Sequence, residues 1–238
     1  SAPYPIGVTT ITWTATDGAG LTDQCTQTIT VYPAYRLTLS IFLQGPFNSS
    51  TELMNPDLSS NGQVPLSQPY NTAPWNYATA DAVTSLDNDI VDWLLIELRE
   101  DDMITTHARK AGLLHADGSV TVSFYGLVTE GEEYYVVVWH RNHIPVMSDE
   151  MISIPITGQF LDMTTLDACY GTKPMIQLTS SIYGMIAGEV IPDGQLKYSG
   201  SYNDRGAILA RLLDEGGTFV SDTEEDGYRS ADVNMNNE

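Results

Sequence analysis

The chain has 238 residues, with 10 Lys and Arg against 31 Asp and Glu, so its formal net charge is −21. Duplex nucleic acid and anionic membrane surfaces are bound through Lys and Arg, so this balance excludes both as partners. Hydrophobic residues make up 42% of the chain, which is enough to form a core and excludes disorder. The longest apolar run, 134–139, is too short for membrane insertion.

Two alternating segments open the chain. Residues 8–15 alternate apolar residues with threonine, a turn cluster follows at 17–20, and residues 25–31 alternate again. This pattern predicts a β-hairpin that Pro33 closes. A hairpin of this size is not stable alone, so we expect it either to complete a module upstream or to add strands to the sheet of another chain. Since Ser1 is not an initiator methionine, we expect a fragment of a longer protein.

This segment resembles the last strands of the hyalin-repeat (HYR) module, an extracellular immunoglobulin-like β-sandwich often found in tandem in adhesins. The matching stretches run from Tyr4 to Asp17, with a Pro-x-Gly-x-Thr-x-Ile pattern, and from Gly20 to Thr26. The resemblance covers about 30 residues, and it implies that Cys25 pairs with a cysteine of an earlier strand. From the residues alone, a disulfide to Cys169 and two separate thiols both stay open, and the 144-residue spacing excludes zinc-finger and iron–sulfur motifs.

The central part of the chain, 34–183, has the pattern of an all-β domain. Asp117-Gly118 and the segment 130–133 are turn signals between alternating runs. Helical periodicity is missing from the expected strands, which are 37–43, 91–99, 105–114, 120–125, 134–140, 151–156 and 175–178. The pattern predicts an antiparallel β-sandwich of immunoglobulin-like or jelly-roll type.

A long irregular stretch, 48–88, interrupts this domain. Such an excursion usually has a function or a partner. Its aromatic residues Tyr70, Trp75 and Tyr77 are candidates for contact with a ligand, such as a sugar ring, or with a neighbouring subunit. The alternative for Trp75 is that it covers the sandwich core, and the alternation around Trp93 favours a core position for that residue.

The last segment, 184–238, contains two candidate calcium loops. Calcium prefers six to eight oxygens, which a loop supplies from alternate positions. The two loops share a register 43 positions apart, which indicates an internal duplication, and a short helix is expected after the Asn203-Asp204 cap. The candidate ligands are Glu189, Asp193, the Gln195 backbone and Asp204 for the first loop, and Asp232, Asn234 and Asn236 for the second. Two polar turns without metal remain the alternative, particularly since Ile191 occupies a ligand position.

This tail resembles the dockerin-like calcium repeat at the C-terminal ends of large secreted Bacteroidota proteins. The match is carried by Tyr198-Ser199-Gly200 and Asn203-Asp204-Arg205. The central domain resembles the domain that precedes this repeat in the same proteins, through the words at 66–75, 90–93, 140–143 and 170–175. The resemblance implies a secreted, cell-surface protein with calcium as a cofactor, and it does not define a biochemical role.

Catalytic motifs are not evident. His140 and His143 stand at the expected end of a strand and are interpreted as structural. The acids Asp89, Asp92, Glu97 and Glu100 supply pairs of the kind that glycosidases use, but sequence does not give their separation. There is no nucleophile elbow or phosphate loop.

The leading hypothesis is therefore a non-enzymatic structural or adhesive segment of a large surface adhesin or filament protein. Its expected partners are other copies of itself or adjacent modules, and surface glycans are a further candidate. The alternative hypothesis is a carbohydrate-binding module of a secreted enzyme with a dockerin-like docking tail. The expected organisation is a hairpin at 1–33, a β-sandwich at 34–183 and a calcium-loop tail at 184–238.

Overall fold

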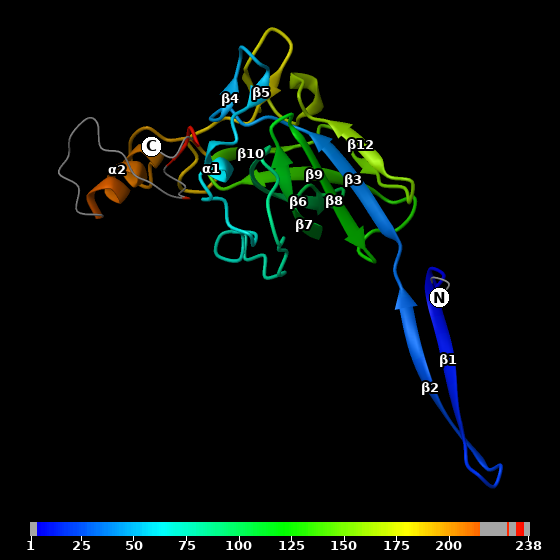
Figure 1. The fold of residues 1–238 in the computed structure, drawn as a ribbon. Coiled ribbons are helices and arrows are strands. Elements are labelled where there is room, and N and C mark those ends of the chain that lie inside the picture. Colours follow the sequence, from blue (N-terminus) through cyan, green and yellow to red (C-terminus); the bar gives the residue numbers. More distant parts are fainter. Residues whose placement is uncertain (1–3, 215–227, 229–231, 236–238) are drawn as a thin grey trace.

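The structure is a computed structural model, and it describes residues 4–214, 228 and 232–235. Strands dominate it, which confirms the all-β prediction (Figure 1). The elements are β1 (Gly7–Thr16), β2 (Thr22–Val31), β3 (Ala34–Ser40), β4 (Phe47–Asn48), β5 (Leu53–Met54), α1 (Asp57–Ser60), β6 (Ile90–Arg99), β7 (Thr106–His115), β8 (Ser119–Tyr125), β9 (Glu133–His140), β10 (His143–Met147), β11 (Ile152–Ser153), β12 (Gln159–Asp162), the 3-10 turn η1 (Leu166–Ala168), β13 (Ile176–Gln177), β14 (Tyr183–Gly184) and α2 (Asp204–Asp214).

The central sheet has the strand order β10-β9-β6-β7-β8-β3-β12, with β11 attached to β9. All neighbours are antiparallel except β12, which runs parallel to β3. β7 and β8 share a single residue pair, Leu114 with Val120. At Gly112 a Cβ would lie only 2.7 Å from a Val122 methyl group, so glycine is needed where these two strands approach closely. The sheet curls over itself at this point (Figure 1).

The core lies on the inner side of the curled sheet. Side chains alternate along each strand, and their inward members are almost completely buried. They include Leu37 and Leu39 of β3, Val122 and Phe124 of β8, Leu94, Ile96 and Leu98 of β6, and Val136 and Val138 of β9. This arrangement agrees with a β-sandwich.

The irregular segment 61–88 covers the outer side of the sheet over β6 and β7. The Tyr70 hydroxyl donates to the carbonyl oxygen of Trp93 at 2.6 Å, and the Trp93 indole donates to the carbonyl oxygen of Pro65 at 2.8 Å. Arg109 of β7 donates to the carbonyl oxygen of Trp75 at 2.7 Å. The long excursion therefore forms a lid that the sheet itself holds in place.

The N-terminal hairpin stands apart from this body. β1 and β2 pair in one uninterrupted register from Gly7 with Val31 to Thr16 with Thr22. The hairpin points away from the sheet (Figure 1), and its residues are half-exposed or exposed. Two residues, Tyr32 and Pro33, connect it to β3.

The C-terminal segment returns to the sheet. α2 begins at Asp204, and the Asn203 side chain caps it by accepting from the Gly206 amide at 2.7 Å, as the sequence predicts. Met235 is 1% exposed and belongs to the core. The expected tail at 184–238 thus contributes residues to the sandwich.

Five strands were not predicted: β4, β5 and β14, which have two residues each, and the longer β10 and β12. Pro145 lies inside β10, and proline within a run argues against a strand except at a sheet edge, which is where β10 lies. β12 has only four residues, too few for a visible alternation. The strand expected at 151–156 shortens to Ile152–Ser153, with Pro155 beyond its end, and the strand expected at 37–43 ends at Ser40.

Candidate functional site

The candidate calcium loops meet on one residue of the turn between β9 and β10. The carbonyl oxygen of Asn142 accepts from the amides of Gly188 and Glu189 at 3.0 and 3.1 Å. The side-chain amide of Asn142 donates to the carbonyl oxygen of Asp232 at 2.6 Å. Glu189 and Asp232 are the first residues of the two loops, and both are buried. Their shared anchor agrees with the predicted duplication.

The first loop is held mainly by Asp204. One Asp204 oxygen accepts from the amides of Val190 and Ile191 at 2.9 Å each, and the other accepts from the amide of Lys197 at 2.8 Å. Asp193 forms an ion pair with the ammonium of Lys197 at 2.6 Å on the exposed side of the loop. Both carboxylates therefore already have partners within the protein.

Glu189 retains one free acceptor. Its Oε1 accepts from the amide of Gly194 at 2.6 Å, whereas its buried Oε2 has no hydrogen-bond partner among the residues that the structure describes. Burial and the nearby charge of Asp204 raise the pKa of Glu189. A free buried carboxylate oxygen fits a cation, but within the described part of the chain no three His, Cys, Asp or Glu side chains are grouped as a metal site. Gln195 lies on the exposed side of the loop.

The second loop is described only in part. Asp232 Oδ1 accepts from the amide of Met235 at 2.7 Å, and Asn234 is exposed. Asn236 lies outside the described residues. The loop packs tightly on the sandwich, because a Cβ at Gly45 would lie 2.0 Å from the carbonyl oxygen of Val233.

We call the contacts of Asn142 with Gly188, Glu189 and Asp232 the Asn142 joint. A buried network of charged and polar side chains lies beside it. Asp92 Oδ2 accepts from His140 Nε2 at 3.1 Å and from Arg141 Nε at 2.9 Å, and Asp92 Oδ1 accepts from the Tyr228 hydroxyl at 2.5 Å. Although burial opposes ionisation, the Arg141 charge and the bonds from His140 and Tyr228 lower the pKa of Asp92 to about 2. Asp92 is thus the ionised centre of the network.

The two histidines of the network are neutral, as the geometry requires. His143 Nε2 accepts from the Gly45 amide at 3.2 Å, so its proton is on Nδ1, which lies 2.9 Å from His140 Nδ1. His140 can then accept there and donate from Nε2 to Asp92. Burial, in both cases the largest cause, lowers the pKa of each histidine. This arrangement agrees with the structural role that the sequence indicates for the pair.

Arg141 is the least satisfied member of the network. It is 5% exposed, and its guanidinium lies 4.3 Å from the centre of the Tyr228 ring. Its Nη1 and Nη2 atoms have no hydrogen-bond partner in the part of the chain that the structure describes. Its positive charge is balanced by Asp92 and by the nearby Asp232, so the network needs no further anion.

The predicted aromatic platform is not available. Tyr70 is 0% exposed and Tyr77 is 7% exposed, so neither presents a ring face to a ligand, and the prediction of a contact role for these two residues is wrong. Trp75 is half-buried and packs edge-to-face against Tyr70, with ring centres 5.1 Å apart. The lid contacts of Trp75 agree with the alternative that it covers the sandwich.

The four acids considered for glycoside hydrolysis do not face one another as a pair. Asp92 and Glu97 stand five positions apart on β6, so they point to opposite faces, and both are buried. Glu97 is held by Arg99, Arg109 and the Trp139 indole. Asp89 pairs with His115 and Glu100 with His107.

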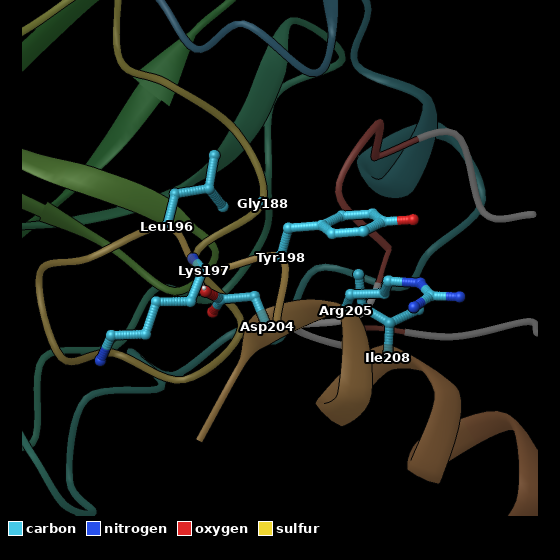
Figure 2. A pocket seen from close by; sticks show the side chains of 7 residues that line it. All are labelled: Gly188, Leu196, Lys197, Tyr198, Asp204, Arg205 and Ile208. Carbon is cyan, nitrogen blue, oxygen red and sulfur yellow. Dashed lines mark hydrogen bonds between the residues drawn. The ribbon is translucent and has the colours of Figure 1, made fainter. Parts of the chain in front are cut away.

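A cavity of about 370 Å³ lies between the first loop and α2 (Figure 2). It is lined by Gly188, Leu196, Lys197, Tyr198, Asp204, Arg205 and Ile208. Tyr198 is 74% exposed, and the Arg205 guanidinium lies 4.8 Å from its ring centre. The lining is mostly apolar, and its one carboxylate, Asp204, is already bound by backbone amides.

The hairpin has two different faces, which follow from the alternation of apolar residues with threonine in the sequence. The apolar face carries Ile11, Trp13, Ala15, Cys25, Ile29 and Val31, of which Trp13 and Cys25 pair directly, and it also carries Gly7, Thr9, Asp23 and Gln27. The other face consists mainly of threonine. Trp13 is 57% exposed, so the apolar face is not covered. Cys25 is a free, exposed thiol, and Cys169 is free and buried, so they do not form a disulfide.

Comparisons with family models, with curated proteins and with solved structures found no match for this chain. Within the described ranges there is no helix with the length and apolar character that crossing a membrane requires. The candidate functional features are therefore those of the molecule itself: the uncovered hairpin face, the Asn142 joint and the cavity beside α2.

Proposed function

We propose that the chain is a non-enzymatic, extracellular structural segment of a large surface adhesin or filament protein, and that it assembles through its N-terminal hairpin. The observation that carries this proposal is the apolar face of the hairpin, which is exposed at Trp13, on a hairpin that extends away from its own sandwich. A two-stranded ribbon is at best marginally stable in water, so this face needs a partner sheet. The partner is another copy of the chain or an adjacent module.

The edges of the hairpin support the same function. β1 contains no charged residue and no proline, and β2 contains one acid, Asp23. Edge strands that are protected against pairing with another chain usually carry lysine, proline or a β-bulge. β1 and β2 contain no lysine or proline, and their register has no bulge. Such an edge is suited to strand addition.

The carbohydrate-binding alternative has less support. Its platform depended on Tyr70, Trp75 and Tyr77, and two of these rings are buried. Calcium remains part of the proposal as a stiffener of the tail, supported by the free buried oxygen of Glu189.

The test is the oligomeric state of the chain with and without a chelator, measured by sedimentation velocity. We expect association that Ile11→Lys weakens at least tenfold. Thr12→Lys is the matched control, since it places the same charge one residue further along β1 on the threonine face. Chelator-insensitive monomers at all concentrations would contradict the proposed function.

A further inference from the structure

The outer side of the sheet is covered over β6 and β7 but open over β8, β3 and β12. The lid at 61–88 forms its hydrogen bonds with β6 and β7. On β3, Tyr35, Leu37 and Leu39 point inward and are buried, so the intervening residues point outward. We call the outward set the open face, and it consists of Ala34, Arg36, Thr38, Ser40, Ser119, Thr121, Ser123, Tyr125, Phe160 and Asp162.

The open face carries two large exposed aromatic rings. Phe160 pairs across from Thr38, and Tyr125 pairs across from Ala34, so both rings lie on the outward side. Each is 59% exposed. β12 ends the sheet, with its outer edge unpaired within the described strands. An exposed apolar patch beside a strand edge is typical of an interaction surface.

The hairpin of the same chain is poorly placed to cover this face. Only Tyr32 and Pro33 connect β2 to β3, and proline fixes its own backbone torsion. The Tyr32 ring lies against Gly126, where a Cβ would be 2.6 Å from the ring. These contacts direct the hairpin away from the body (Figure 1).

We propose that the hairpin of one copy lies with its apolar face across the open face of a second copy and that the second copy returns the same contact. The hairpin is long enough to cross the open face, because a ten-residue strand extends about 34 Å and the seven residues of β3 extend about 24 Å. Because each copy has one hairpin and one open face, a twofold dimer contains the contact between hairpin and open face twice. This inference rests on the proposed function and names the partner and its surface.

Charge favours this contact over others between two copies. The chain carries −21, so most of its surface repels a second copy. The paired strands of the hairpin carry one acid, Asp23. The strands of the open face carry one base, Arg36, and one acid, Asp162, and are therefore neutral together. The contact joins two surfaces of little net charge and offers Arg36 as a partner for Asp23.

The experiment uses two single variants of the full chain and their mixture. Ile11→Lys alters the hairpin face, and Phe160→Lys alters the open face. We expect the wild-type chain to sediment as a dimer of 26.1 kDa subunits, and each variant to raise the dissociation constant at least tenfold. Thr12→Lys and Ile104→Lys, the latter at a 79% exposed loop position, are the controls and should dimerise as the wild type does. Circular dichroism checks that every variant is folded.

The mixture decides which surfaces meet. In an equimolar mixture of Ile11→Lys with Phe160→Lys, the unaltered hairpin of one chain still meets the unaltered open face of the other. We expect this mixture to regain a dimer that neither variant forms alone. A mixture that stays monomeric would overturn the inference. A dimer insensitive to Phe160→Lys would overturn it in favour of a hairpin-to-hairpin contact, and either outcome leaves the proposed function standing. Monomeric wild type, or association insensitive to Ile11→Lys, would overturn both.

Discussion

The side-chain amide of Asn142 donates to the carbonyl oxygen of Asp232 at 2.6 Å, across 90 positions of sequence. The same residue, through its own carbonyl oxygen, holds the start of the first candidate loop at Glu189. One turn of the sheet therefore binds the first residues of both candidate loops. The nearby bond from Tyr228 to Asp92 adds a second connection between tail and sheet.

The first prediction concerns the contact of the second loop with Gly45. We expect Gly45→Ala to destabilise the protein by about 1–3 kcal/mol, because its methyl group would overlap the carbonyl oxygen of Val233 and displace the loop. Gly18→Ala is the control, since a Cβ there meets nothing within 4 Å. Urea unfolding measures the difference in stability. Equal midpoints for the two variants would show that the contact of the second loop with Gly45 does not contribute to the stability of the sandwich.

The pattern of apolar residues predicted the major strands β1, β6, β7, β8 and β9, which are seven to ten residues long. β8 alternates between buried and less buried side chains, whereas β6 is buried along nearly its whole length and β1 is largely exposed. The helix at Asp204 was predicted from its cap. The lid was recognised as irregular, but alternation does not reveal which face a loop covers, so the burial of Tyr70 and Tyr77 was missed.

The contacts of Asn142 with the two loops could also not be predicted from the sequence. Its partners Gly188, Glu189 and Asp232 are distant along the chain, and a single asparagine in a turn carries no periodic signal. The sequence indicates a structural role for His140 and His143, but it does not show that Asp92, Arg141 and Tyr228 join them in one buried network. The faces of the hairpin, by contrast, can be read directly from the alternation once the register of β1 with β2 is known.

The second prediction concerns the centre of the buried network. We expect Asp92→Asn to cost about 3–5 kcal/mol, because it leaves the charge of Arg141 buried without its main partner. Glu130→Gln, at an exposed position, removes the same charge from the surface and should change stability little. A loss below about 1 kcal/mol for Asp92→Asn would contradict an ionised role for this carboxylate.

The third prediction is the pH dependence of stability. Burial lowers the pKa values of His140 and His143 in the native state. Below the unfolded histidine pKa of about 6.5, the unfolded state therefore binds more protons than the native state does. Stability should therefore fall as the pH drops from 7.5 to 5, by up to about 2.7 kcal/mol per pH unit for two histidines. Asp92, with a pKa of about 2, adds stability that is lost only as the pH falls from about 4 towards 2.

Urea unfolding at a series of pH values measures this dependence. His143→Asn removes one of the two buried histidines and should reduce the slope between pH 7.5 and 5, whatever its effect on stability at neutral pH. An unchanged slope in this variant would show that His143 is not held neutral by the fold.

The last prediction separates the structural from the metal-binding role of the first loop. Asp204 accepts three backbone amides, so Asp204→Asn should destabilise the protein by about 1–3 kcal/mol even with a chelator present. Glu189 Oε2 has no such bond, and Glu189→Gln should instead reduce the thermal stabilisation that added calcium gives. Melting curves of both variants and the wild type, with calcium and with chelator, distinguish the two roles. If calcium leaves the wild-type melting temperature unchanged at millimolar concentration, the loop is a polar turn that Asp204 closes without metal, as the alternative interpretation of the sequence holds.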